Sequence, residues 1–293
     1  MQVLVTGGLG YIGSHTSVLL LEKGYDLVIV DDLSNSNEKV IENISKITSK
    51  VPVFEKIDLK NKESVSKLFN NYDFDGIIHF AAHKSVNESV SYPDKYFKNN
   101  VGSLENIIYE IQKLKKPMNF IFSSSCTVYG QADSMPINEG FELKKAESPY
   151  GQSKRKCEEI LENFHKTGHN FKNITLRYFN PIGAHPTSLI GELPIGIPEN
   201  LVPYITQTAV GKRDHLTVFG DDYDTNDGTC VRDYIHIMDL AEVHITCLEK
   251  LMNIKDNSFF NVYNVGTGKG TSVLELINPV SYTHLRAHET IAD

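Results

Sequence analysis

A tyrosine and a lysine four residues apart, Tyr150 and Lys154 in the stretch ESPYGQSK, are able to move a proton. Ser148 and Pro149 are typical of a helix N-cap and first turn, so both side chains are predicted on one helical face, one turn apart. A free tyrosine titrates at about 10, but an ammonium neighbour, a helix N-terminus and a bound cationic ring all favour the phenolate. We therefore expect a lowered pKa for Tyr150 and a base suited to alcohol oxidation, with an ordinary surface pair as the alternative.

A glycine-rich turn follows the first predicted strand. The stretch TGGLGYIGSH places Gly7, Gly10 and Gly13 between that strand, 2–6, and a helical pattern. Glycines permit a tight turn and a close approach of the backbone to a phosphate, while the helix directs its positive N-terminus at the same group. Many strand–helix turns are rich in glycine, but this context predicts dinucleotide binding.

Asp31 ends the second predicted strand, 26–31. A carboxylate at this place accepts hydrogen bonds from the ribose hydroxyls of an adenosine and repels a 2′-phosphate, which favours NAD over NADP. The alternative is a solvated turn aspartate, a role that we assign instead to Asp32.

The elements that must position these residues alternate along the first 180 residues. Longer helical patterns separate short β-rich runs at 2–6, 26–31, 51–57, 76–82, 119–125 and 173–179. Continuous apolar strands separated by helices predict a parallel sheet covered on both faces, a doubly wound, Rossmann-like α/β fold. Ser125 ends the fifth strand, at the edge where such sheets bind ligands.

The composition changes after Phe179. Residues 180–200 hold four prolines and three glycines, and we predict a long ordered loop there. Beyond it we predict helices near 201–211 and 239–251 and strands at 216–220, 231–237 and 261–266. We expect a dinucleotide-binding domain over 1–180 and a smaller, incomplete substrate lobe over 181–277, parts of which pack back on the first domain.

The glycine loop, Ser125 and the YxxxK spacing together resemble the extended short-chain dehydrogenase/reductase family. The stretches IIHFAAHKSVNESV, IFSSSCTVYG, LRYFNPIGAHP and GTCVRDYIHIMDLA are similar to those of its UDP-glucose 4-epimerases, and the similarity extends to about residue 277. The resemblance implies interconversion of UDP-galactose and UDP-glucose, a step of galactose metabolism, by a tightly bound NAD. In this cycle sugar C4 gives up a hydride, and the 4-keto intermediate receives it back on its other face.

The resemblance also implies a role for each matching residue. The catalytic residues are Ser125, Tyr150 and Lys154. The NAD site comprises Gly7, Gly10, Tyr11, Ile12, Gly13, Asp31, Asn35, Asp58, Leu59, Phe80, Lys84, Asn99, Tyr150, Lys154 and Phe179. The UDP-sugar contacts are Lys84, Ser125, Tyr150, Asn180, Asn200 and Arg232. The guanidinium fork of Arg232 suits a diphosphate, and a structural ion pair with Asp233 is its alternative.

Two alternatives to this activity stay open. One is a 4-epimerase of another UDP-sugar, such as a pentose, a uronic acid or an N-acetylhexosamine. The other is a truncated, non-catalytic NAD or sugar-nucleotide binding module, because residues 278–293 do not resemble the family and we expect them to be a non-native tail. A sugar-nucleotide dehydratase is disfavoured, because residues 124–127 supply no acidic pair for eliminating water.

Composition excludes several other classes. A net charge of −8 leaves no basic face for nucleic acid or an anionic membrane, and no apolar run reaches a membrane span of about 20 residues. The N-terminus shows no secretory pattern, and four widely spaced cysteines without a CxxC indicate reduced thiols in a cytoplasmic protein. No metal is expected, since the paired histidines and the acidic run 221–227 lack the patterns of zinc and calcium sites. The family suggests a homodimer.

Overall fold

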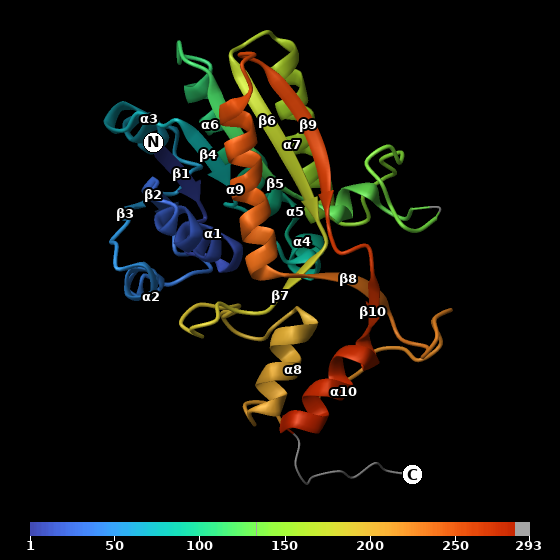
Figure 1. Cartoon of the computed structure of the whole chain (residues 1–293). Coiled ribbons are helices and arrows are strands. Elements are labelled where there is room, and N and C mark those ends of the chain that lie inside the picture. The colour runs from blue at the N-terminus through green and yellow to red at the C-terminus, as the bar shows by residue number, and fades with distance from the viewer. Residues whose placement is uncertain (133, 285–293) are drawn as a thin grey trace, which may run out of the picture.

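Seven parallel strands form the central sheet of the computed structural model, which describes residues 1–132 and 134–284 (Figure 1). Their order is β3-β2-β1-β4-β5-β6-β9. The bounds are β1 (Gln2–Thr6), β2 (Asp26–Asp31), β3 (Val53–Lys56), β4 (Gly76–His79), β5 (Met118–Ser125), β6 (Phe171–Tyr178) and β9 (Phe259–Val265). The first six match the predicted runs, so the doubly wound α/β fold is confirmed.

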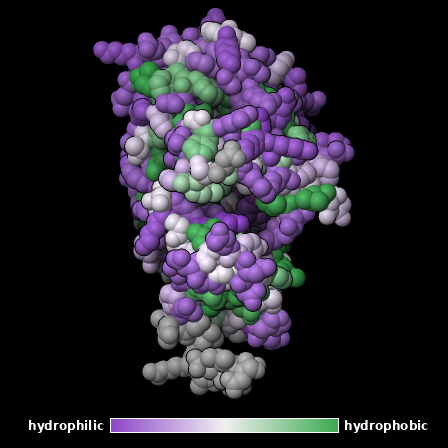
Figure 2. Space-filling model, turned by 90° about the vertical axis from the view of Figure 1, so that its right-hand side faces the viewer, coloured by the Kyte–Doolittle hydropathy of each residue, from purple (hydrophilic) through white to green (hydrophobic). Residues whose placement is uncertain are grey.

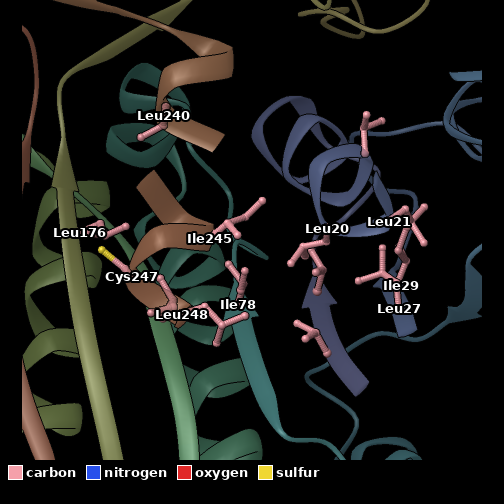
Figure 3. Close-up of a cluster of buried hydrophobic side chains, with 14 of the residues drawn as sticks. Leu20, Leu21, Leu27, Ile29, Ile78, Leu176, Leu240, Ile245, Cys247 and Leu248 are labelled. Atoms are coloured by element: carbon pink, nitrogen blue, oxygen red, sulfur yellow. The ribbon is translucent and has the colours of Figure 1, made fainter. Parts of the chain in front are cut away.

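Helices cover both faces of this sheet because alternate residues of each strand point to opposite sides. Val5, Ile29 and Ile78 face one cluster, which Leu20 of α1 and Leu248 of α9 complete (Figure 3). The helices of this face are α1 (Tyr11–Glu22), α2 (Lys39–Thr48) and α9 (Ile237–Asn253).

The opposite face of the sheet carries a second cluster. Leu4, Val28, Ile77 and Phe120 alternate with the first set and pack against Leu161, among others. Its helices are α3 (Lys62–Asn71), α6 (Gly102–Ile111) and α7 (Pro149–Lys166). Between β4 and β5 the chain also forms α4 (Val86–Ser91), α5 (Pro93–Tyr96) and a π-helix, η1 (Phe97–Val101), and a 3-10 turn, η2 (Cys126–Tyr129), follows β5.

A smaller lobe lies beyond the carboxyl ends of the strands, at the bottom of Figure 1. Its sheet has the order β10-β8-β7, and helices α8 and α10 pack against each other. The bounds are β7 (Asn180–Ile182), α8 (Leu201–Ala209), β8 (Val231–His236), β10 (Gly270–Ser272) and α10 (Val273–His284). In Figure 2 its apolar atoms form green groups on a mainly hydrophilic surface.

The structure corrects two predictions in this lobe. The segment 180–200 is not all loop, because β7 pairs with β8 and Ala184 bridges Gly191. The strand predicted at 216–220 is wrong: this run pairs with no strand among the described residues, and Phe219 is 83% exposed. Helix α10 continues past residue 277 to His284, with Pro279 inside it, while the remaining predicted tail, 285–293, lies outside the described residues. The boundaries at 180 and 277 stay predictions.

Candidate active site

The glycine-rich loop connects the end of β1 to α1. Gly7 has φ of 66°, and a Cβ on it would lie 2.7 Å from the backbone nitrogen of Ala81. A Cβ on Gly13 would lie 2.3 Å from the Gly7 carbonyl oxygen, so the helix packs directly on the turn. Gly10 is the N-cap of α1, without a side-chain cap or an acidic residue in the first turn. The N–H groups in the first turn of α1 therefore remain available to bind an anion.

Asp31 stands at the carboxyl end of the neighbouring strand, β2, and is 8% exposed. Its carboxylate accepts hydrogen bonds from Leu9 N at 3.1 Å, Leu33 N at 3.0 Å and Ser36 Oγ at 2.7 Å. Burial raises the pKa of Asp31, and these three donors oppose that shift. The carboxylate thus holds the glycine loop in addition to its predicted contact with a ribose.

The other residues predicted for NAD lie after successive strands of the sheet. Asp58 and Leu59 follow β3, and Lys60 connects Asp58 at 3.2 Å to Asn99 at 3.1 Å. Phe80 follows β4 and contacts His244 in a tilted arrangement, with ring centroids 4.7 Å apart. The remaining predicted residues are Ile12 on α1, partly buried; Tyr11, whose hydroxyl donates to Gly183 O; Phe179 after β6; and Asn35, exposed before α2. Apart from Asn99, which lies in η1, these positions follow the carboxyl ends of strands, where a doubly wound sheet binds ligands.

Ser125, Tyr150 and Lys154 converge at the end of β5. Ser148 caps α7 by accepting from Gly151 N, as predicted, and places Tyr150 in the first turn. Ser125 Oγ accepts two hydrogen bonds from Thr127, from N at 3.2 Å and from Oγ1 at 3.0 Å. Its own hydrogen is left to donate, and the Ser125 hydroxyl lies close enough to the phenol of Tyr150 to lower the pKa of that phenol. Lys154 Nζ donates to the Ser123 carbonyl oxygen at 2.6 Å.

The protonation of this trio differs from the prediction. Burial raises the pKa of Tyr150 above its ordinary value, and the neighbouring Tyr178 adds to the rise, while the hydrogen bond from Ser125 opposes it. Burial also lowers the pKa of Lys154 to about 8. The prediction of a lowered Tyr150 pKa is therefore wrong for this structure, because burial penalises every charged form, the phenolate included.

Two of the predicted ligand-binding residues meet at one carboxylate. Glu192, in the segment between β7 and α8, pairs with Lys84 at 2.8 Å and accepts from Asn200 Nδ2 at 2.6 Å. The charge of Glu192 also adds to the burial that raises the pKa of Tyr11. Lys84 and Asn200, 116 positions apart in the sequence, therefore converge on the same carboxylate oxygen of Glu192.

The alternative role for Arg232 is not observed. Asp233 is occupied by the turn 267–268, accepting from Thr267 N at 2.9 Å and from Gly268 N at 2.8 Å. Within residues 1–132 and 134–284, Arg232 forms no ion pair. Burial raises the pKa of Cys126, the residue after Ser125, and the charge of Arg232 opposes that rise. Arg232 and Asn180 lie on the neighbouring strands β8 and β7.

Sequence reasoning missed three residues of this region. Thr127 orients Ser125, Glu192 binds Lys84 and Asn200, and Glu158 lies buried one turn beyond Lys154. Only Glu158 had a usable signal, because the pattern Y-x-x-x-K-x-x-x-E places it on the face of Tyr150 and Lys154. The other two depend on contacts that no local pattern encodes.

The residues present fit a dinucleotide. An uncapped helix N-terminus, a glycine turn that a Cβ would fill and a buried carboxylate on the next strand are the features that such a cofactor requires. Among the described residues no cluster could hold a metal ion, and no helix is long and apolar enough to cross a membrane. Fold and site define an NAD-dependent enzyme of the doubly wound class.

Comparison with known proteins specifies that class further. The NAD dependent epimerase/dehydratase family matches residues 3–266, and the chain belongs to this family. It is 48% identical over 277 residues to the UDP-glucose 4-epimerase of Bacillus subtilis, covering 94% of this chain and 80% of the relative. The UDP-glucose 4-epimerase uge1 of Schizosaccharomyces pombe is 47% identical over 285 residues, covering 95% and 79%. The resemblance drawn from the sequence is confirmed.

Solved structures agree with these relatives. A UDP-glucose 4-epimerase of Bifidobacterium longum in complex with NAD+ and UDP has a TM-score of 0.91 and 42% identity, covering 98% of this chain and 84% of that one. One from Stenotrophomonas maltophila, with bound NAD and formylated UDP-arabinopyranose, has a TM-score of 0.91 and 45% identity, covering 97% and 83%. NAD as the cofactor is thereby supported for this chain.

Proposed function

We propose that this protein interconverts UDP-galactose and UDP-glucose by oxidation and re-reduction at sugar C4. The observation that carries the proposal is the convergence of Ser125, Tyr150 and Lys154 beside the glycine-rich loop. The relatives named as UDP-glucose 4-epimerases cover nearly the whole chain and support the same activity.

Each residue of the trio has a distinct task. Bound NAD would accept the hydride from C4 and later return it. Tyr150 as phenolate takes the proton of the sugar 4-hydroxyl. Ser125, polarised by Thr127, donates a hydrogen bond to the oxygen of that hydroxyl as its charge changes. Lys154 keeps a positive charge beside the base, and a neighbouring cation favours the phenolate form. On re-reduction the proton returns from Tyr150 to the same oxygen.

The second lobe holds the nucleotide. Arg232 presents a bidentate fork for the diphosphate, and Lys84, Asn180 and Asn200 supply further donors around it. This anchoring leaves the hexose free to turn its other face to the nicotinamide, which inversion at C4 requires. The relative with formylated UDP-arabinopyranose makes a UDP-pentose the second candidate substrate.

The test is conversion of UDP-galactose to UDP-glucose by the purified chain loaded with NAD. We expect turnover in the wild type and a loss of about hundredfold or more in Tyr150→Phe. Tyr109→Phe, a change at an exposed tyrosine of α6, is the matched control. Full activity of Tyr150→Phe would refute the assigned base. A wild type that binds NAD and UDP without turnover would support the non-catalytic module. Faster turnover of a UDP-pentose than of UDP-galactose would support the second candidate substrate.

We also propose a homodimer through η1, α6 and α7. A hollow of about 650 Å³ opens on this face, with Phe97 and Val101 in its wall. Lys98, Glu105 and Lys156 lie around it, so a second copy can offer complementary charges. Light scattering during gel filtration should give twice the chain mass of 32.9 kDa, and a single-chain mass would exclude the dimer.

The four cysteines are free, in keeping with the predicted cytoplasmic location.

A further inference from the structure

Glu158 continues the buried stripe of α7 that carries Tyr150 and Lys154. The three residues are spaced four apart and therefore lie on one helical face. Glu158 is 7% exposed, whereas the side chain of the adjacent Glu159 is 49% exposed. A buried carboxylate is costly unless it is paired and hydrogen-bonded, so its partners show why it is tolerated.

Arg177 on β6 is the main partner of Glu158. Its Nε lies 3.0 Å from Oε1 and its Nη2 lies 2.6 Å from Oε2, a bidentate pair with both side chains less than one-tenth exposed. Ser124 Oγ donates a third hydrogen bond to Oε1. Because Ser124 and Arg177 are opposite each other in the β5–β6 register, the carboxylate joins α7 to both strands.

The same network reaches the turn on the other side of Ser125. Arg177 Nη1 donates to Tyr129 Oη at 2.9 Å, and Tyr129 Oη donates to Asn264 Oδ1 of β9 at 2.7 Å. Tyr129 ends η2, which begins immediately after Ser125. The Glu158–Arg177 pair therefore fixes Ser124, the turn η2 that follows Ser125, and the helix α7 that carries Lys154.

The charge of Glu158 also acts on Lys154. Burial lowers the pKa of Lys154, and Cys157 and then Glu158 are the groups whose charges oppose that shift. Of the other groups around it, His79 is neutral at physiological pH because burial lowers its pKa to about 3. The remaining titratable neighbours are Tyr150 on α7, Tyr178 on β6, which bonds Ser123, and Tyr96 on α5, which contacts Tyr150.

We propose that Glu158, held by Arg177, is a positioning residue for the reaction at C4: it fixes Ser125 and Lys154 relative to each other and keeps Lys154 charged. This inference rests on the proposed function, in which Lys154 acts as a cation. Replacing a buried ion pair with apolar residues is often neutral or stabilising, because desolvation offsets much of the attraction. Stability alone is therefore a weak reason for a pair at this place.

The first test is Glu158→Gln, which keeps the size and removes the charge, with the exposed Glu159→Gln as control. The titration of Lys154 is followed by the 13Cε shift in lysine-labelled protein, and its signal is assigned by its absence in Lys154→Met. We expect the pH midpoint of the Lys154 titration to fall by about half a pH unit or more in Glu158→Gln. In Glu159→Gln this midpoint should remain at the wild-type value. This measurement needs no turnover, so it stands even if the epimerase assay fails.

The second test separates positioning from stability. In Glu158→Leu/Arg177→Met both charges are removed, so no buried charge is left unpaired and the fold is expected to persist. We expect kcat to fall about tenfold or more, with KM for UDP-galactose little changed and the melting temperature near that of the wild type. An unchanged Lys154 midpoint in Glu158→Gln overturns the electrostatic role, and wild-type kcat in the double variant overturns the positioning role. If the double variant does not fold, kcat of Glu158→Gln relative to Glu159→Gln tests the positioning role instead, and a wild-type kcat in Glu158→Gln overturns it.

Discussion

Lys154 Nζ lies 2.6 Å from the carbonyl oxygen of Ser123, so the helix that begins at Pro149 is held against the strand that ends at Ser125. This contact places an ammonium group 3% exposed in the interior beside a phenol that is itself buried. The site therefore keeps a positive charge where the fold alone would favour a neutral side chain.

Lys154→Met should separate activity from stability. Burial lowers the pKa of Lys154 from 10.5 to about 8, so the unfolded chain binds this proton more tightly than the folded one. The charge consequently destabilises the fold at neutral pH, and the wild type gains stability as the pH rises above about 8. We expect the variant to unfold with at least the wild-type free energy at neutral pH, an advantage that shrinks toward about pH 10, and to lose activity about hundredfold or more.

Urea unfolding followed by circular dichroism at several pH values measures this difference. Lys166→Met, at an exposed position on the same helix, is the control and should show no such pH dependence. A Lys154→Met protein that is less stable than the wild type by the same amount at every pH would contradict the prediction.

Gly13→Ala should destabilise the glycine loop. The new Cβ would lie 2.3 Å from the Gly7 carbonyl oxygen and 2.7 Å from Gly8 Cα, both backbone atoms that cannot move aside cheaply. We expect a loss of about 2 kcal/mol or more in the free energy of unfolding and weaker NAD binding. Gly102→Ala is the matched control, because a Cβ there meets no atom within 4 Å and alanine favours the helix by about 1 kcal/mol. Equal melting temperatures in the two variants would argue against the close packing.

Asp31→Asn should change cofactor preference and weaken the contact with the glycine loop. The carboxylate repels a 2′-phosphate, so we expect NAD affinity to fall about tenfold and discrimination against NADP to weaken. Because burial raises the Asp31 pKa, its ionised form costs stability above that pKa, and the neutral amide avoids this cost. The amide nitrogen cannot accept the hydrogen bond from Leu9 N, however, so we expect a lower melting temperature. Calorimetric titration with both cofactors and a thermal melt test this, with Asp32→Asn as control. Unchanged discrimination would remove Asp31 from the ribose site.

Glu192→Gln should tighten binding of UDP. Its carboxylate occupies Lys84 at 2.8 Å and Asn200 at 2.6 Å, two donors proposed for the anionic substrate, and would repel an incoming diphosphate. We expect the Kd for UDP to fall about fivefold, which corresponds to about 1 kcal/mol. The exposed Glu63→Gln of α3 should leave the Kd unchanged. A higher Kd in Glu192→Gln would mean that the carboxylate instead orients the two donors.

Much of the fold was predictable because its signals are local. The β-rich runs at 2–6 and 119–125 became β1 and a β5 that begins one residue earlier. Buried parallel strands must be apolar along their whole length, so such runs are hard to mistake. The run 216–220 is also apolar and β-rich, but it pairs with no strand among the described residues. Strand pairing depends on segments far apart in the chain, so this run alone could not predict it.

By itself, the sequence determined the parallel α/β fold, the glycine turn after β1 and the one-turn spacing of Tyr150 and Lys154, because each depends on residues near one another in the chain. The tertiary structure alone decided the environment of these residues. It raised the Tyr150 pKa where the spacing predicted a fall, because burial comes from every element packed around α7. It also brought Lys84 and Asn200 to Glu192, and Arg177 to Glu158, since such long-range pairs exist only once the strands have taken their order.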